Sequence, residues 1–237
     1  IGRAGERPVP PLNLVGDFGG GGMFLAFGLM CAVFEAQRSG RGQVVDVSMV
    51  DGSAALMHMM YQFMAMGAWR DERGVNMLDG AAHFYDTFET ADGKYISIGS
   101  IEPQFYALLV QLAGLDAVEF APQNEQARWP DLKDKLAAVI RRRTREEWCA
   151  IMEGTDVCFA PVLSMNEAPL HPHNVARGTF IEVDGVTQPA PAPRFSRTAP
   201  AMPAAPGPAG GDTSAVLAAI GYSEERIDAL RQAGALS

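Results

Sequence analysis

Apolar residues form two helical stretches within the first 70 residues. Residues 23–37 are apolar on nearly every side of a helix, which predicts a helix buried between layers that ends at Ser39-Gly40. Residues 51–69 predict a second helix, rich in methionine. The segment between them, residues 43–48, is predicted to be a short strand.

A different pattern begins near residue 78, where short strands and helices alternate as in a small α+β unit. The turn Ala91-Asp92-Gly93 predicts a hairpin of strands 84–89 and 94–99. Capping boxes at Thr144-x-x-Glu147 and Ser164-x-x-Glu167 predict local helix starts. We further expect helices at 103–112, 130–142 and 144–152, a strand at 157–162, and a second hairpin over 179–188.

The end of the chain is dense in proline, alanine and glycine. Residues 189–211 cannot form regular hydrogen-bonded structure over most of their length, so we expect an extended segment that wraps over other protein. Short helices at 214–219 and 223–232 are predicted to close the chain.

Composition is that of a globular protein of one or two domains, with 48% hydrophobic and 20% charged residues among 237. A net charge of −9 and a pI near 4.9 argue against nucleic acid or an anionic membrane as a partner, because both attract clustered Lys and Arg.

The chain has three cysteines, Cys31, Cys149 and Cys158, an odd number without Cys-x-x-Cys spacing. Disulfides and zinc sites are therefore not expected, and we expect a cytoplasmic location.

No apolar run is expected to reach the ~18 residues of a membrane span, because Gly28, Glu35 and Arg38 interrupt the longest one. No signal peptide opens the chain. The first residue is Ile, so we expect the chain to begin inside a longer protein or after processing.

The clearest candidate for chemistry is Asp17, which precedes four glycines and the first apolar helix. If that helix starts near Gly21 or Gly22, its positive end would keep the carboxylate ionised. Nearby N–H groups, those of Gly19 and Gly20, could then bind a developing oxyanion. The simpler alternative is a glycine turn whose aspartate caps the helix.

Other motifs are weaker. The glycine string lacks the Gly-Lys-Ser/Thr of a phosphate loop and the spacing of a dinucleotide fingerprint. His171-Pro-His173 has no nearby cysteine or carboxylate pair, which favours a helix-entry loop over a metal site. His58 lies among methionines, where a histidine is more often a core residue than a catalyst.

Several blocks resemble the class III CoA-transferase family, which includes formyl-CoA transferase, carnitine CoA-transferase and α-methylacyl-CoA racemase. They are Gly16-Asp17 with its glycines, residues 39–48, 91–95 and 221–223. Within the family, residues 76–80 and 101–106 resemble the bacterial α-methylacyl-CoA racemases.

The resemblance implies a large α/β domain of Rossmann type that binds CoA, a small α+β domain, and an interlocked homodimer. It places residues 1–70 in the large domain, 71–185 in a linker and the small domain, and 186–237 in an extension that returns to the large domain. The family's N-terminal part would lie upstream of this chain.

The resemblance also implies the site. Asp17 matches the racemase carboxylate that moves the α-proton, and its partner histidine matches none of the four histidines here. Glu102 matches a carboxylate that orients that histidine; the alternative is a plain acid at a helix start ahead of Pro103.

An apolar surface for the acyl tail is implied at Met49, Met77 and Leu78, within a window that holds seven of the twelve methionines.

The predicted activity is therefore racemisation of 2-methylacyl-CoA thioesters in fatty acid metabolism, without a metal or cofactor other than the CoA of the substrate. Two alternatives stay open. One is CoA transfer through an aspartyl intermediate, and the other is a catalytically incomplete fragment that provides dimerisation and an acyl pocket.

Overall fold

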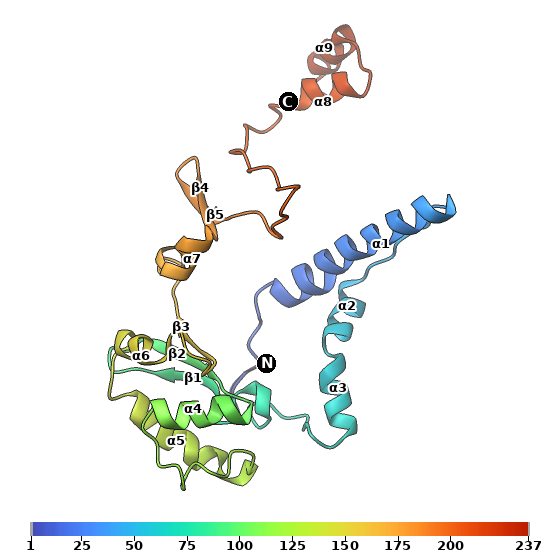
Figure 1. The fold of residues 1–237 in the computed structure, drawn as a ribbon. Coiled ribbons are helices and arrows are strands. Elements are labelled where there is room, and N and C mark those ends of the chain that lie inside the picture. The colour runs from blue at the N-terminus through green and yellow to red at the C-terminus, as the bar shows by residue number, and fades with distance from the viewer. Residues whose placement is uncertain (1, 237) are drawn as a thin grey trace. The chain divides into compact units, whose positions relative to one another are not determined.

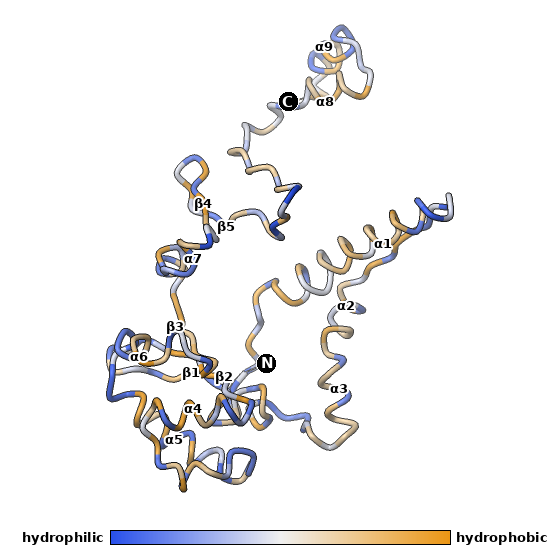
Figure 2. Tube along the Cα trace, viewed as in Figure 1, coloured by the Kyte–Doolittle hydropathy of each residue, from blue (hydrophilic) through white to orange (hydrophobic). Residues whose placement is uncertain are grey.

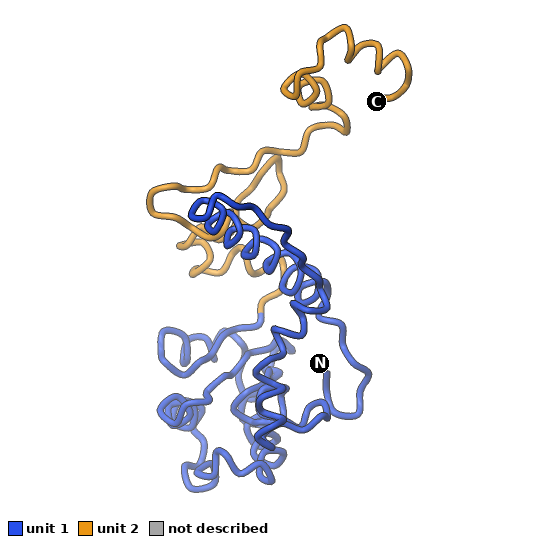
Figure 3. Tube along the Cα trace, turned by 90° about the vertical axis from the view of Figure 1, so that its right-hand side faces the viewer, with its two compact units in different colours: residues 1–162 blue, residues 163–237 orange. Residues whose placement is uncertain are grey.

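A computed structural model describes residues 2–236 of the chain. The chain divides into two compact units, residues 1–162 and 163–237 (Figure 3). In the first unit (Figure 1), where η marks a π- or 3₁₀-helix, the elements are η1 (Leu14–Met23), α1 (Phe24–Ser39), α2 (Met49–Leu56), α3 (His58–Ala65), η2 (Met77–Asp79), β1 (Tyr85–Glu89), β2 (Tyr95–Gly99), α4 (Pro103–Leu112), η3 (Gln126–Arg128), α5 (Trp129–Ile140), α6 (Arg145–Met152) and β3 (Phe159–Val162). The second unit contains η4 (Ala168–Leu170), α7 (Pro172–Arg177), β4 (Phe180–Val183), β5 (Val186–Pro189), α8 (Thr213–Ala219) and α9 (Glu224–Gln232).

The core of the first unit is a small α+β body built on an antiparallel sheet in the order β1-β2-β3. Tyr85 pairs with Gly99, and Tyr95 pairs with Val162. Helices α4, α5 and α6 supply most of the other buried residues of one hydrophobic cluster, which includes Phe84, Phe88, Ile96, Leu109, Leu132, Leu136, Ile140, Trp148 and Met152. Each large apolar side chain buried here contributes roughly 1.5–3 kcal/mol before entropy is subtracted. The predicted hairpin and the helix at 103–112 are confirmed.

Capping explains where several helices begin. The Thr144 hydroxyl accepts from the Glu147 N–H at 3.2 Å, and the Glu147 carboxylate accepts from the Thr144 N–H at 2.7 Å. Ser164 and Glu167 exchange the same two bonds at 3.2 and 2.9 Å. Both pairs of bonds are present, but only the Thr144 box begins a helix, α6; the Ser164 box closes a turn that precedes η4.

The first 70 residues form a different kind of structure, a set of helices outside that core. Helices η1 and α1 run on from Leu14 to Ser39 (26 residues), and the helix predicted over 51–69 is broken at Met57 into α2 and α3. The strand predicted at 43–48 is wrong for the described residues, because a strand needs a neighbour to pair with. Instead the segment runs beside α1, where a Cβ added to Gly28 would lie 3.1 Å from Val45 Cγ1.

Much of this helical region is apolar, as its colouring shows (Figure 2). Many of its apolar side chains are exposed: Phe27 is 72% exposed and Met66 is 76% exposed. By length and composition, the helix over 14–39 is long and apolar enough to cross a membrane. The expectation that no segment reaches the length of a membrane span is therefore wrong. Those two properties do not distinguish a membrane span from a helix that other protein covers.

In the second unit, β4 and β5 pair as the predicted antiparallel hairpin, with Phe180 opposite Pro189. His171 is the residue before α7, which confirms the helix-entry interpretation of His171-Pro-His173. Ile227 is buried in the pair of α8 and α9. Between β5 and α8 the described chain has no helix or strand, as its composition predicts. The predicted domain boundaries and the wrapping role stay predictions.

Candidate functional site

Asp17 lies inside a wide helix, not ahead of one. In η1, a π-helix, each N–H bonds the carbonyl five residues earlier; the first such bond runs from the Phe18 N–H to the Asn13 oxygen at 3.1 Å. The expected helix start near Gly21 or Gly22 is therefore wrong. The glycines do not mark a turn before the helix; they form its body.

The reason for glycine in this body is the close approach of α2. A Cβ on Gly52 would lie 1.9 Å from the Gly20 carbonyl oxygen, and a Cβ on Gly20 would lie 2.8 Å from the Ser53 nitrogen. Only residues without a side chain allow two helix backbones this close. Gly20 and Gly52 are buried, so the contact fixes the Asp17 helix against α2.

The free N–H groups at the start of η1 belong to Val15, Gly16 and Asp17, because the helical bonds begin at Phe18. The N–H groups of Gly19 and Gly20 follow Phe18 and lie among the hydrogen-bonded residues of the helix. Their predicted role in binding an oxyanion is untested, and this position does not favour it. The better placed donors, which the sequence did not indicate, are Gly16 and Asp17.

The carboxylate of Asp17 is exposed and makes no hydrogen bond or ion pair within residues 2–236. It sits in the first turn, at the positive end of the helix, where negative charge is favoured. A capping role would require a bond from its oxygens to a backbone N–H. The structure therefore leaves this carboxylate available for chemistry.

Met49 joins this part of the site. It is the first residue of α2, whose start is capped by Ser48 accepting from the Val50 N–H at 3.2 Å. A Cβ on Gly21 would lie 3.1 Å from Met49 Cγ, so the thioether lies directly against the Asp17 helix. Met49 is 53% exposed and presents a flexible apolar surface beside it.

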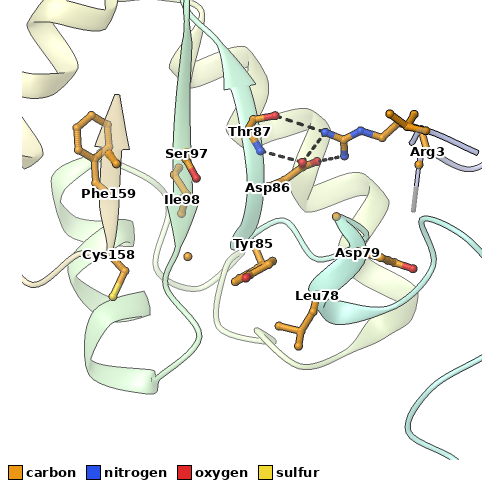
Figure 4. A pocket seen from close by; sticks show the side chains of 15 residues that line it. Arg3, Leu78, Asp79, Tyr85, Asp86, Thr87, Ser97, Ile98, Cys158 and Phe159 are labelled. Atoms are coloured by element: carbon orange, nitrogen blue, oxygen red, sulfur yellow. Dashed lines mark hydrogen bonds and ion pairs between the residues drawn. The ribbon is translucent and has the colours of Figure 1, made fainter. Parts of the chain in front are cut away.

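The second part of the site is a cavity of about 660 Å³ on the α+β body (Figure 4). Thr87 and Ser97 line it, while Phe88 and Ile96, which alternate with them along β1 and β2, are buried in the core. The larger apolar walls come from Leu78, Tyr85, Ile98 and Phe159. Leu78 lies in the cavity wall, whereas Met77 packs against the core, and the acyl role of both stays a prediction.

Tyr85, Ile98 and Phe159 were not identified from the sequence. Their positions on three strands become neighbours only when the strands pair.

Glu102 is exposed at the start of α4 and makes no side-chain cap bond, although Pro103 occupies the first turn. It is close to Cys158, which lines the cavity: burial raises the pKa of the Cys158 thiol, and the charges of Glu102 and Asp156 raise it further. Glu102 is thus near the cavity, but it also stands at a helix start ahead of Pro103, so the alternative of a plain acid at a helix start stays open and its orienting role stays a prediction.

The predicted site residues therefore fall into two groups. Asp17, Gly19, Gly20 and Met49 are on the helices of the first 70 residues, and Met77, Leu78 and Glu102 are on the α+β body. Within residues 2–236, no hydrogen bond or ion pair joins a residue of the first group to one of the second.

Among the residues described, no group of three or more His, Cys, Asp or Glu side chains is placed to hold a metal ion. His83 is not a candidate base: it is fully buried, bonds the Tyr106 hydroxyl at 2.7 Å, and burial together with the Lys133 charge lowers its pKa to about 4.

Comparison with known proteins assigns the family. Residues 1–213 match the model of CoA-transferase family III. The chain belongs to CoA-transferase family III. The family's fold is also found in a solved CAIB/BAIF family protein from Brucella suis, with a TM-score of 0.74 and 19% identity over 93% of this chain and 59% of that one. The α/β class III CoA-transferase fold expected from the resemblance is confirmed.

Among curated family members, the α-methylacyl-CoA racemase of Mus musculus is 50% identical over 231 residues, and that of Homo sapiens is 44% identical over 230. Each match covers 96% of this chain and 60% of the racemase. A succinyl-CoA–D-citramalate CoA-transferase of Chloroflexus aurantiacus is 31% identical over 68% of this chain. The chain thus spans about 60% of the length of the racemases it matches, and the similarity to racemases exceeds that to this transferase.

Proposed function

We propose that the protein racemises 2-methylacyl-CoA thioesters, removing the proton beside the thioester on one face and returning a proton on the other. The observation that carries the proposal is the exposed, unpartnered carboxylate of Asp17 beside free N–H groups, in a chain 50% identical to a racemase. Asp17 acts as one acid/base. The second acid/base is the histidine that the family resemblance implies, which matches none of the four here.

Negative charge develops on the thioester oxygen when the α-proton leaves. The N–H groups of Gly16 and Asp17 precede the hydrogen-bonded turns of η1, and they stabilise that oxygen as preorganised donors. A single such donor is worth roughly 10²–10³-fold in rate.

The acyl tail must move between two positions while the CoA part stays bound. Met49 and the cavity walls around Leu78 supply an apolar surface for this movement. Glu102, near the cavity, orients the second acid/base and stabilises its charged form.

The protein is further proposed to act as an interlocked homodimer. The support is the division of the site into two groups, together with the exposed apolar side chains of residues 14–66 that other protein would cover. We propose acyl-CoA as its only small-molecule partner, no nucleic acid or membrane partner, no further cofactor, and a cytoplasmic location. The three free thiols are compatible with that compartment.

Incubating one epimer of a 2-methylacyl-CoA with the full-length protein in deuterated water tests this function. We expect the opposite epimer to appear carrying deuterium at the α-carbon. CoA transfer, the alternative within the family, predicts no α-deuterium. It predicts instead a covalent thioester or anhydride on Asp17 that hydroxylamine traps and peptide mass spectrometry locates.

A further inference from the structure

Asp86, on the edge strand β1, holds two cations at once. Its carboxylate lies 2.6 Å from Arg3 Nη2 and 2.6 Å from Lys133 Nζ, and it accepts the Thr87 N–H at 2.8 Å. The side chain of Asp86 is only 9% exposed, against 48% for Arg3 and 23% for Lys133. The bonds from Arg3 to Asp86 and Thr87 are drawn in Figure 4.

This carboxylate remains charged. Burial alone would raise the pKa of Asp86, but the hydrogen bonds from Arg3, Lys133 and the Thr87 N–H lower it below its ordinary value. A buried carboxylate with every partner in place resists rearrangement, because removing its charge leaves two cations without their counter-charge.

The same contacts fix the turn that carries Leu78. Lys133 Nζ also donates to the Gly80 carbonyl, and Gly80, with φ of +91°, ends η2. The positive φ favours glycine at this position, and a Cβ on Gly80 would lie 2.6 Å from Arg3 Nη1, so a side chain there would also displace the arginine.

The other end of that turn is closed by a capping box. The Asn76 N–H donates to Asp79 Oδ1 at 2.8 Å, and the Gly74 N–H donates to Asp79 Oδ2 at 2.9 Å. The three-residue turn η2 is therefore held from both sides.

We propose that Asp86 is a positioning residue that sets acyl selectivity: with Arg3 and Lys133 it locks the Leu78 wall of the cavity in place. Arg3, Leu78, Gly80 and Asp86 all line this one cavity, so a shift of the network is a change of the cavity's shape. The proposal rests on the function proposed above only in that the cavity receives the acyl group. Asp86 acts through Leu78 and exchanges no proton with substrate.

The test compares Asp86→Asn and Arg3→Gln with Glu89→Gln in the full-length protein. Glu89 is on the same strand and pairs with Arg141 at 3.2 Å, but both side chains are well exposed and neither lines the cavity. Such a surface pair contributes little. Arg3→Gln removes one cation from the exposed end of the network and keeps the protein testable if Asp86→Asn does not fold.

We expect Asp86→Asn and Arg3→Gln to raise KM for a long-chain 2-methylacyl-CoA roughly tenfold, with a smaller change in kcat, since a misplaced wall weakens positioning. In both variants the ratio of kcat/KM for long acyl groups to kcat/KM for short ones should fall. Arg3→Lys, which keeps the charge, should retain more of this ratio than Arg3→Gln does. Glu89→Gln should have the wild-type ratio.

Backbone hydrogen exchange over residues 77–80 should also become faster in Asp86→Asn and Arg3→Gln. This readout does not depend on turnover, so it separates a failure of the proposal from a failure of racemase activity. Unchanged exchange at 77–80, or a loss confined to kcat with selectivity intact, would overturn the proposal.

Discussion

Replacing Gly52 by alanine tests how the Asp17 helix is held. The new Cβ would lie 1.9 Å from the Gly20 carbonyl oxygen, whereas ordinary contact begins near 3.4 Å, so η1 and α2 must separate by about 1.5 Å. Both partners are helix backbone and cannot rotate away. Overpacking of this kind costs ~1–3 kcal/mol, and we expect a value near the upper end.

The matched control is Gly16→Ala in the same helix, where a Cβ would meet nothing within 4 Å. Alanine is favoured over glycine in a helix by roughly 1 kcal/mol, so this variant should be neutral or stabilising. The two alanines should therefore act in opposite directions.

Hydrogen exchange of peptides within residues 14–56 measures the effect locally. A loss of ~3 kcal/mol should raise exchange through local opening roughly 100-fold in Gly52→Ala, while Gly16→Ala should exchange no faster than wild type. Fluorescence of Trp129 and Trp148, both buried in the α+β body, should be unchanged in either variant. Equal exchange in the two variants would refute the contact between Gly20 and Gly52.

Three further outcomes are expected. The pKa of His83 is about 4 in the folded protein against an ordinary 6.5, so the unfolded chain binds a proton more readily. The free energy of unfolding should therefore be about 3 kcal/mol higher above pH 6.5 than near pH 4, and it should fall as pH is lowered through that window. Urea unfolding followed by tryptophan fluorescence measures this change. His83→Gln should flatten that slope, and exposed His58→Gln should not. Thr144→Ala should lower stability by ~1 kcal/mol in the same assay because it removes a helix cap, and Thr144→Ser, which keeps the capping hydroxyl, should not. Turnover should survive dialysis against EDTA, whereas loss of activity that zinc or magnesium restores would contradict proton transfer without a metal.

Local chemistry made part of this fold predictable from sequence. The Asp92-Gly93 turn, the Thr144 capping box and Pro103 at a helix start each act within a few residues, and the elements they predict are where they were expected. Leu78 lines a cavity, but its acyl role came from the family resemblance and stays a prediction.

The predictions that were wrong, and the features that the sequence did not predict, depend on contacts between residues far apart in the chain. The wide helix around Asp17 is tied to the packing of Gly20 on Gly52, which no pattern within residues 13–23 reveals. Arg3 and Asp86 are 83 positions apart, and nothing in either neighbourhood specifies the other. Such juxtapositions follow from tertiary structure.

The most direct test of the account is α-proton exchange by the full-length protein carrying Asp17→Asn. The substitution keeps shape and CoA binding but removes one acid/base. Racemisation in both directions, and exchange with deuterated water of the epimer whose α-proton faces Asp17, should therefore fall ~10²–10⁴-fold, whereas the other epimer can still exchange its proton at the second acid/base. Asp51→Asn, an exposed acid in the first turn of α2, should exchange at the wild-type rate. Intact racemisation, or exchange that survives at the wild-type rate for both epimers in Asp17→Asn, would contradict the assignment of Asp17 as the group that moves the proton.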